Sequence, residues 1–511
     1  MTQALVALLA LVAGAPAPLL VLPPDTASED VPAARLAEAV SDLLPHALAF
    51  LDVPAIARAD RLLALQALDV PPVKLTRATT IRVAEAVQAE RMVVGRLELQ
   101  GDEVQLSLRL LDVQRGTLSA PFTASGSQAR LTELVDDLAW EVALAGARTT
   151  RSNAELKSRR RTPLPEAVGA YVLGLQGSES AQRVRSLRRA LQLSPSFDEV
   201  RLELGRLQLL IRDSQGAFDT LDPVQLPGLT RSARFLQGRS LLERGHYREA
   251  AALYATLVSK DPTPAALNNH ALALLRQTSP PLVASEVLRK AIELQPADTD
   301  FAFNLGFAML VENDPAAAVF WLQGVVKQSP RDSHARALLA WALRRAGRAE
   351  EADEAWRAVV ALAPSLEPLQ KEDLSRRFER IAPSELRLLP NENARSHAEL
   401  SALHLSRAEK AQQAGDAETL ERELQLAAAS DPFNPRAHVQ LARLLKQRTD
   451  FEKALAEFRR ALWCREDAAV RVELAQLLKA LGREAEARAE AARALKADPA
   501  NEAARKLAAG R

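Results

Sequence analysis

Four prolines at a fixed spacing constrain the fold of this chain more than any other feature. Each proline closes a stretch of helical apolar spacing, and the four follow one another at intervals of 34 residues: Pro262, Pro296, Pro330 and Pro364. Because proline has no amide hydrogen to donate to a continuing helix, each one is expected to end a helix. A repeated unit of this length holds two short helices that bury their apolar faces only against neighbouring units. The spacing therefore predicts a stack of antiparallel helix pairs, an α-solenoid.

Small and large residues recur at the same places within each unit. In the unit that ends at Pro364, Gly347 marks the turn between the helices, while Ala352 and Trp356 occupy packing sites of the second helix. Small residues let two helices approach closely, and large ones fill the space between units. The pattern resembles the tetratricopeptide repeat (TPR). We expect about six such repeats over residues 164–366, and about three over 401–511 together with a C-terminal cap.

Residues 367–400 interrupt this period. Lys371 to Ile381 has the pattern of a charged helix, whereas Pro383 does not fit a repeat helix. The flanking prolines, Pro364 and Pro432, are nevertheless 68 residues apart, which equals two periods. Two interpretations stay open: a degenerate repeat, or an irregular insert that separates two blocks of repeats or forms a binding element.

The first part of the chain has strands as well as helices. An apolar run over residues 18–22 precedes two prolines and predicts a short buried strand. Residues 92–99 and 104–113 flank a Gly-Asp turn, and the second stretch largely alternates apolar and polar residues, which predicts a β-hairpin. Helical spacing recurs within residues 36–44, 81–87 and 131–144. The fold class is therefore mainly α, with a small α/β domain ahead of the solenoid.

The order of these elements resembles the TolB amino-terminal-like domain. The resemblance covers residues 17–147 and depends mainly on turn and packing residues: Gly95, Gly101-Asp102, Leu111-Asp112, Gly116 and Asp136 to Ala139. It implies a small α/β interaction domain of bacterial envelope proteins, without a catalytic constellation.

The residues before this domain indicate the cellular compartment of the protein, and those after it form its connection to the repeats. Residues 4–15 are apolar and end in Ala13-Gly14-Ala15, so we expect a signal peptide over residues 1–16. Export would make the protein periplasmic or secreted in a bacterium. The alternative is the cytoplasm, because no Lys or Arg precedes Arg35. Residues 148–163 are rich in arginine and are expected to form a solvated basic linker.

The sequence lacks the common signatures of catalysis and of metal binding. It has no Walker A loop, no dinucleotide-binding glycine motif and no zinc-protease or esterase motif. Its seven histidines are scattered, and only His397 and His404 are close in sequence; these two are expected at the surface rather than as metal ligands. Its one cysteine, Cys464, is expected to be packed. A net charge of +1 argues against binding of nucleic acid by bulk electrostatics. We therefore expect no enzyme activity, cofactor or metal, and no nucleic-acid partner.

The expected binding surface is the concave face of the solenoid, which the first helix of each repeat lines. Aromatic, basic and amide residues interleave at the corresponding positions, so this groove could stack apolar side chains of an extended peptide and pair its carboxylates with arginines. The resemblance to TPR proteins implies that Asn304 holds a peptide backbone. Packing of the aromatic residues between repeats is the alternative. The predicted groove residues are Phe235, Arg239, Asn269, Arg276, Phe303, Asn304, Phe307, Trp341, Arg344 and Arg345.

These observations favour a non-enzymatic adaptor or scaffold that binds a segment of a protein partner, in a bacterial envelope or secreted assembly. A cytoplasmic regulatory protein is the alternative. In that case the front domain senses a ligand and the repeats hold an enzyme or a transcription regulator.

Overall fold

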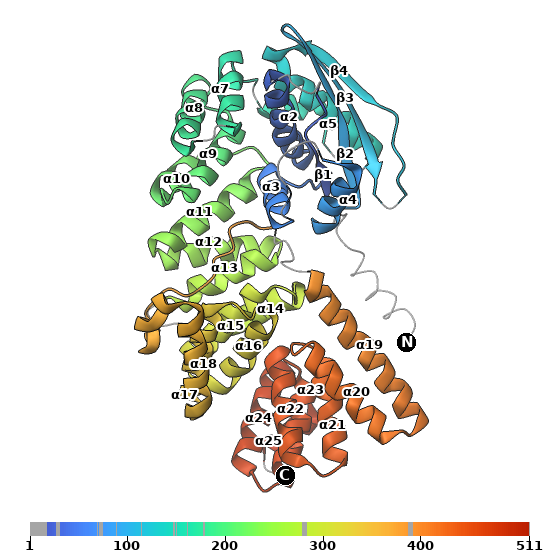
Figure 1. The fold of residues 1–511 in the computed structure, drawn as a ribbon, viewed down its shortest axis with the longest axis vertical. Helices are drawn as coiled ribbons and strands as arrows, with labels where there is room; N and C mark the ends of the chain where they lie inside the picture. The colour runs from blue at the N-terminus through green and yellow to red at the C-terminus, as the bar shows by residue number, and fades with distance from the viewer. Residues whose placement is uncertain are drawn as a thin grey trace. The chain divides into compact units, whose positions relative to one another are not determined.

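The computed structural model describes residues 18–26, 31–68, 70, 75–87, 89–113, 115–146, 149, 151–160, 162–176, 179–277, 284–386 and 392–509. The expected signal peptide over residues 1–16 lies outside them. The chain divides into two compact units: unit 1 comprises residues 1–261 and 383–388, and unit 2 comprises residues 262–382 and 389–511. The fold is mainly helical, with one small sheet near the start of the chain (Figure 1). The expected fold class is confirmed.

Unit 1 begins with a four-stranded sheet in the order β1-β2-β3-β4. Strand β1 (Leu19–Val21) is parallel to β2 (Arg91–Gln100), whereas β3 (Glu103–Asp112) and β4 (Phe122–Ser127) are antiparallel to their neighbours. Gln100 pairs with Glu103 across a two-residue turn, where Gly101 has a φ of 65° that suits glycine. The expected hairpin is confirmed. Strand β4 was not expected, because its small and polar residues lack apolar alternation.

Helices pack against this sheet. They are α2 (Val31–Phe50), α3 (Arg58–Ala67), α4 (Arg77–Ala86) and α5 (Leu131–Gly146), with the short η1 (Gln128–Arg130) before α5. Leu20 of β1 and Met92 of β2 lie in one apolar cluster with Leu65 of α3 and Val83 of α4. Helices α2 and α5 contact each other and the sheet. The cluster and these contacts form the core of the front domain.

Three helix pairs complete unit 1: α7 (Pro165–Gln176) with α8 (Ser180–Leu193), α9 (Asp198–Leu210) with α10 (Ser214–Leu221), and α11 (Thr230–Arg244) with α12 (Tyr247–Lys260). The expectation of a solvated linker ahead of them is wrong for its central part. Residues Asn153–Arg160 form helix α6, and the Arg160 side chain is 3% exposed. Arg160 forms ion pairs with Asp136 of α5 and with Glu199 of α9, so it ties the front domain to the first repeats.

Unit 2 contains the remaining helices. They are α13 (Pro264–Leu275), α14 (Ala284–Leu294), α15 (Thr299–Val311), α16 (Pro315–Gln328), α17 (Ser333–Arg345), α18 (Ala349–Leu362), η2 (Pro364–Gln370), α19 (Glu392–Ala414), α20 (Ala417–Ser430), α21 (Pro435–Gln447), α22 (Phe451–Cys464), α23 (Ala468–Ala480), α24 (Glu484–Ala497) and α25 (Glu502–Ala508). Several begin with a side-chain cap, such as Asp332, whose carboxylate accepts the amide hydrogen of Ala335 at 3.0 Å. Consecutive helices pair as hairpins.

The expected charged helix over Lys371–Ile381 is wrong. Between η2 and residue 386 the described chain contains no helix or strand. Its backbone groups are bonded instead by side chains of the preceding repeats, as described below. Local helical spacing is a weak preference that such tertiary contacts override.

Candidate functional site

The first helices of three consecutive repeats hold an extended segment of the chain itself. Residues 369–382 lie against α13, α15 and α17, all within unit 2 (Figure 1). We call the side of these helices that contacts the segment the A-helix face. Bound in this way, the segment shows which groups of the A-helix face can hold a polypeptide and how each one does so.

Two buried asparagines bond to the backbone of the segment. The Asn304 amide donates to the carbonyl oxygen of Arg380 at 2.9 Å, and its oxygen accepts the Arg380 amide hydrogen at 2.8 Å. Asn269 binds Ala382 in the same way, at 3.1 and 2.8 Å. A carboxamide carries both a donor and an acceptor, so it can satisfy both polar groups of one residue. Because alternate residues of an extended chain face the same side, the two asparagines can hold residues two apart.

Asn268 connects these two contacts. It accepts a hydrogen bond from the Asn304 amide at 2.7 Å and donates to the Arg380 carbonyl at 3.1 Å and to Asn269 at 3.1 Å. All three asparagine side chains are fully buried. Buried amides without partners would destabilise the fold, and the segment supplies some of those partners. The triad therefore forms a backbone-binding site within the core of the repeats.

An aromatic pocket holds Phe378. Its ring centroid lies 5.3 Å from that of Trp341 at an interplanar angle of 90°, and 6.1 Å from that of Phe307. The ring centroid of His334 lies 6.4 Å from that of Phe378, on a further side of the pocket. The Trp341 indole also donates a hydrogen bond to the carbonyl oxygen of Leu369 at 3.0 Å. Edge-to-face packing of this kind favours an aromatic side chain at this position.

A second pocket holds the guanidinium of Arg380. It lies 3.7 Å above the Phe303 ring, and its two terminal nitrogens bind Asp300 at 2.9 Å and Asp332 at 2.6 Å. Two carboxylates and an aromatic face match the charge and the planar shape of an arginine. This pocket is acidic, whereas the predicted groove was aromatic and basic.

Arginines of the A-helix face bind the acidic and carbonyl groups of the segment. Arg276 pairs with both Glu379 oxygens at 2.6 Å, and donates to the carbonyls of Leu374 and Ser375 at 3.1 Å each. Arg345 pairs with Glu372 at 3.2 Å. The sequence predicts such pairing with the carboxylates of a partner peptide, whereas these carboxylates belong to the chain itself.

The structure brings seven of the ten predicted residues together around the segment: Asn269, Arg276, Phe303, Asn304, Phe307, Trp341 and Arg345. The other three have different surroundings. Arg344 pairs with Asp353 of α18. Phe235 and Arg239 belong to unit 1, where Phe235 packs against Tyr254 and Arg239 pairs with Glu243. Binding of a partner by these residues stays a prediction.

Sequence reasoning missed four residues of the A-helix face: Asn268, Asp300, Asp332 and His334. A search for aromatic and basic residues passes over acids, and Asp332 also caps a helix, which is a sufficient structural reason for its presence. The adjacent pair Asn268-Asn269, opposite Asn304 one repeat later, was the available signal.

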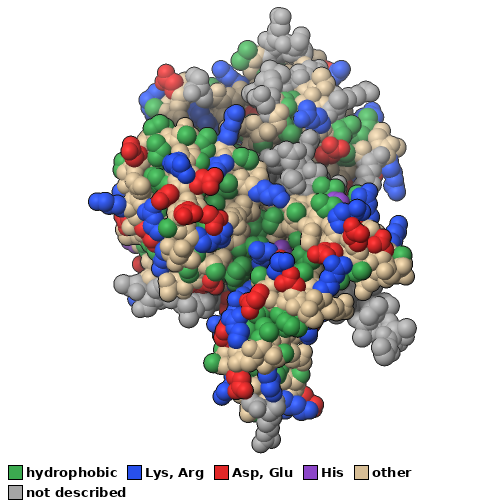
Figure 2. Space-filling model, turned by 60° about the horizontal axis from the view of Figure 1, so that its bottom comes forward, with side chains coloured by type: hydrophobic (Ala, Val, Ile, Leu, Met, Phe, Trp, Pro, Cys, Tyr) green, Lys and Arg blue, Asp and Glu red, His purple; other side chains and the backbone are tan. Residues whose placement is uncertain are grey.

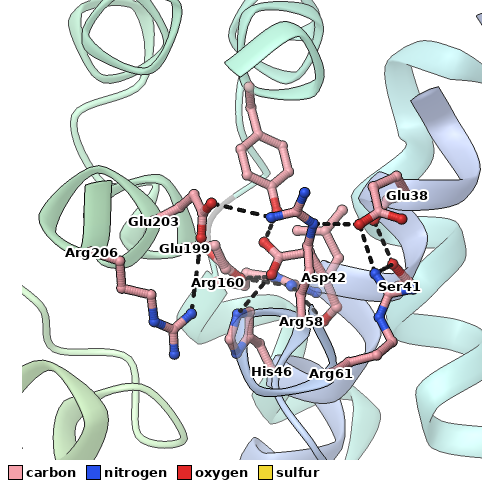
Figure 3. Close-up of polar contacts among 12 residues, drawn as sticks. Glu38, Ser41, Asp42, His46, Arg58, Arg61, Arg160, Glu199, Glu203 and Arg206 are labelled. Carbon is pink, nitrogen blue, oxygen red and sulfur yellow. Dashed lines mark hydrogen bonds and ion pairs between the residues drawn. The ribbon is translucent and has the colours of Figure 1, made fainter. Parts of the chain in front are cut away.

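Unit 1 contains a buried cluster of charges where the front domain meets the first repeats (Figure 3). Arg58 of α3 binds Glu38 of α2 at 2.6 Å and Glu203 of α9 at 3.2 Å. Tyr171 of α7 donates its hydroxyl hydrogen to Asp42 of α2. Paired charges therefore join the front domain to the first repeats.

The cluster shifts the pKa of its acid and of its base. Burial alone would raise the pKa of Asp42, but the hydrogen bond and charge of His46, the charge of Arg58 and the Tyr171 hydroxyl lower it well below its ordinary value. Burial would likewise lower the pKa of Arg58, yet the surrounding carboxylates raise it. These contacts favour the ionised form of both groups.

A cavity of about 370 Å³ lies beside this cluster within unit 1. Helices α3, α9 and α11 and residues 383–385 line it. Its wall combines leucines with the charged side chains of Arg183, Glu203, Arg206 and Arg239. The volume is within the range of pockets for small molecules.

Three buried histidines and the cysteine have structural surroundings. The three are His46, His404 and His438, and the expected surface position is wrong for His404. His404 and His438 each lie 2.7 Å from a glutamate, so paired carboxylates account for their burial. Cys464 is buried as expected, and burial raises the pKa of its thiol well above the ordinary value. In the described part of the chain no group of three or more His, Cys, Asp or Glu residues could hold a metal ion.

On the face drawn in Figure 2, Lys and Arg side chains are interspersed with Asp and Glu side chains. Among the helices that the structure describes, none is both long and apolar enough to span a membrane.

Comparisons with known proteins identify TPR repeats in the chain. Family models of the tetratricopeptide repeat match residues 235–299 and 468–501. No curated protein matches the sequence. These two models do not cover the front domain, so its resemblance to the TolB amino-terminal-like domain stays a prediction.

The chain is similar to several solved structures, some of which are described as TPR proteins. One is YrrB, described as a TPR protein with an unusual peptide-binding site, at 17% identity and a TM-score of 0.30, covering 35% of this chain and 94% of that one. Another is the human IFIT1 dimer with PPP-AAAA, at 16% identity and a TM-score of 0.26, covering 67% and 79%. A third is the C-terminal part of a TPR repeat-containing protein from Cytophaga hutchinsonii, at 13% identity and a TM-score of 0.32, covering 54% and 99%.

Proposed function

We propose that this protein is a non-enzymatic scaffold that binds an extended segment of a partner protein on its A-helix face. TPR repeats are protein–protein interaction modules, and no catalytic family is indicated. The observation that carries the proposal is the pair of asparagines, Asn269 and Asn304, each of which satisfies the backbone of one residue of an extended segment. Backbone hydrogen bonds of this kind are available to a segment of any protein, while the neighbouring pockets select its side chains.

The test selects peptides on an open form of the face. A library of random dodecamers is displayed on phage and selected against the full chain carrying Phe378→Ala and Arg380→Ala, which removes the two side chains that anchor the internal segment. We expect recovered peptides whose binding weakens about tenfold or more on further substitution of Asn304→Ala, because two hydrogen bonds to the backbone are lost.

The matched control is Arg348→Ala, at a nearby position whose guanidinium pairs with Glu351 of α18. This substitution should leave peptide binding unchanged. Recovery of no peptide, or of peptides that bind equally with Asn304→Ala in a chain of unchanged helicity, would contradict the proposed function.

A bacterial envelope or secreted location is part of the proposal. It is supported by the apolar residues 4–15 and by the resemblance of residues 17–147 to the TolB amino-terminal-like domain. A fusion to a reporter enzyme that is active only after export tests it. Reporter activity that depends on residues 1–16 is the expected result, and activity confined to a cytoplasmic reporter would favour the regulatory alternative.

The cavity in unit 1 favours a second candidate function, the binding of a small ligand. Its leucines suit the apolar part of a ligand, and its charged groups of both signs suit a polar part. Anilinonaphthalene sulfonate, which has both an apolar and a charged part, is a suitable fluorescent probe. Leu207 lines the cavity, and its replacement by the larger tryptophan should fill the space and abolish the gain in dye fluorescence. A gain that persists in this variant would show that the dye binds elsewhere.

A further inference from the structure

We propose that Phe378–Ala382 is an internal ligand that blocks the A-helix face, and that the external partner carries the same pattern in an extended segment. This inference rests on the proposed function and adds its regulation and the chemistry of its partner. The pattern consists of an aromatic residue, an acid, an arginine, an unspecified residue and a small residue. It corresponds to Phe378, Glu379, Arg380, Ile381 and Ala382.

Each specified position has its own contact on the face. The aromatic residue enters the pocket of Phe307, Trp341 and His334. The acid pairs with Arg276. The arginine lies over Phe303 between two carboxylates. The small residue, Ala382, is 1% exposed and has both backbone groups bound, so a larger side chain would need space that its neighbours occupy.

The contacts also fix the direction of the bound segment. Phe378 contacts α15 and α17, Arg380 is held mainly by α15, and Ala382 is bound by α13. The segment therefore runs opposite to the order of the repeats. The acid of the pattern lies at Arg276 and the arginine at Asp300 and Asp332, so a segment in the reverse direction would place charges of like sign together.

The mode of attachment is that of a ligand rather than of a core element. Residues 371–386 contain no helix or strand, and Glu379, Arg380 and Ala382 are anchored by side chains of the repeats. Residues 375–377, ahead of Phe378, are exposed. A segment tethered to its own site competes at a millimolar effective concentration, which an external ligand has to exceed. The apparent affinity for the partner falls in proportion to the fraction of closed molecules.

The test compares one peptide on closed and open forms of the full chain. The probe is a fluorescein-labelled peptide with the sequence of residues 374–383, and its binding is followed by fluorescence anisotropy. We expect the variant with Phe378→Ala and Arg380→Ala to bind the peptide at least tenfold more tightly than the wild type. Arg376→Ala is the matched control, because that side chain pairs with Asp373 within the segment itself, and it should behave as the wild type does.

Specificity and folding are tested with the same assay. A peptide that carries glutamate in place of Arg380 should not bind the open variant. If the double variant loses helicity, the single substitution Arg380→Ala replaces it, with a smaller gain in affinity in the same direction.

Three results would overturn the inference. The first is equal affinity of the wild type and the open variant for the peptide. The second is an open variant that binds selected dodecamers but not this peptide, which leaves the proposed function intact. The third is a light-scattering mass that shows the wild type to be a dimer and the Arg380→Ala variant to be a monomer. That result would mean that the segment binds to a second copy of the chain. Absence of any peptide binding to a folded open variant would instead contradict the proposed function.

Discussion

Arg58 provides a quantitative test of how the front domain and the first repeats of unit 1 depend on each other. Its guanidinium bonds to Glu38 of α2, to Glu203 of α9 and to the carbonyl oxygen of Leu175 in α7, and its side chain is 7% exposed. Arg58→Ala removes this connection between three helices at once.

The expected loss of stability depends on the carboxylates that Arg58→Ala leaves without this partner. Removing one partner of a buried ion pair costs about 3–5 kcal/mol, because the other charge stays buried without compensation. Here Glu38 keeps Arg61 at 2.6 Å and Glu203 keeps Arg183 at 3.1 Å. We therefore expect the low end, a loss of about 3 kcal/mol in the free energy of unfolding of unit 1.

Native-state hydrogen exchange followed by mass spectrometry measures this loss locally. Peptides from α2 and from α9 should lose protection together, by about two powers of ten in exchange rate for 3 kcal/mol. Arg130→Ala, which removes an ion pair at the surface, is the control and should leave protection unchanged. Loss of protection in α2 alone, or no loss in either helix, would refute the argument that buried charges couple the two parts.

Three further predictions test other parts of the structure. Cys464 should not react with a maleimide in the folded protein at neutral pH and should react fully in urea, because its thiol is buried; rapid reaction in the folded state would contradict this. The folded-state pKa of Asp42 is lowered, so its contribution to stability is present above its unfolded pKa near 3.8 and is lost as the pH falls below it; the melting temperature of Asp42→Asn should therefore decline less steeply than that of the wild type below about pH 4, and parallel declines would show otherwise. Gly95→Ala would place a Cβ atom 2.2 Å from the backbone oxygen of Ser107 and should cost about 1–3 kcal/mol in urea titrations, whereas Gly169→Ala, with open space around it, should not destabilise the protein.

The repeats could be predicted from the sequence because their signal is local and repeated. The 34-residue spacing of prolines fixes where helices end, and the positions of the face residues follow from helix geometry. Asn304 and Trp341, for example, lie where their place in the repeat predicts, and both contact a polypeptide segment. The period does not indicate which polypeptide that is.

The occupant of the A-helix face could not be predicted, because its conformation depends on distant residues. Taken alone, residues 371–381 have helical spacing and good helix formers. In the folded chain, Arg276 binds carbonyl oxygens of Leu374 and Ser375 that a helix would use internally, about 100 residues along the chain from it. Such long-range hydrogen bonds leave no local pattern.

The burial of charged side chains could not be predicted, for a related reason. Arg160 lies in an arginine-rich stretch, which is usually solvated, yet it is enclosed by Asp136 and Glu199. His438 is buried beside Glu457, 19 residues away on the next helix. The sequence shows each charge but not the partner that allows it to be buried.

The central claim is that the A-helix face binds an extended polypeptide by its backbone. The exchange of the Arg380 and Ala382 amide hydrogens tests this claim directly in the full chain. Both residues lie outside any helix or strand, and each donates its amide hydrogen to a buried asparagine. Hydrogen exchange resolved to single residues should show both amides protected at least a hundredfold relative to an unstructured peptide, and this protection should fall when Asn269 and Asn304 are replaced by alanine. Exchange of both amides at the rate of an unstructured peptide in the wild type would contradict the claim.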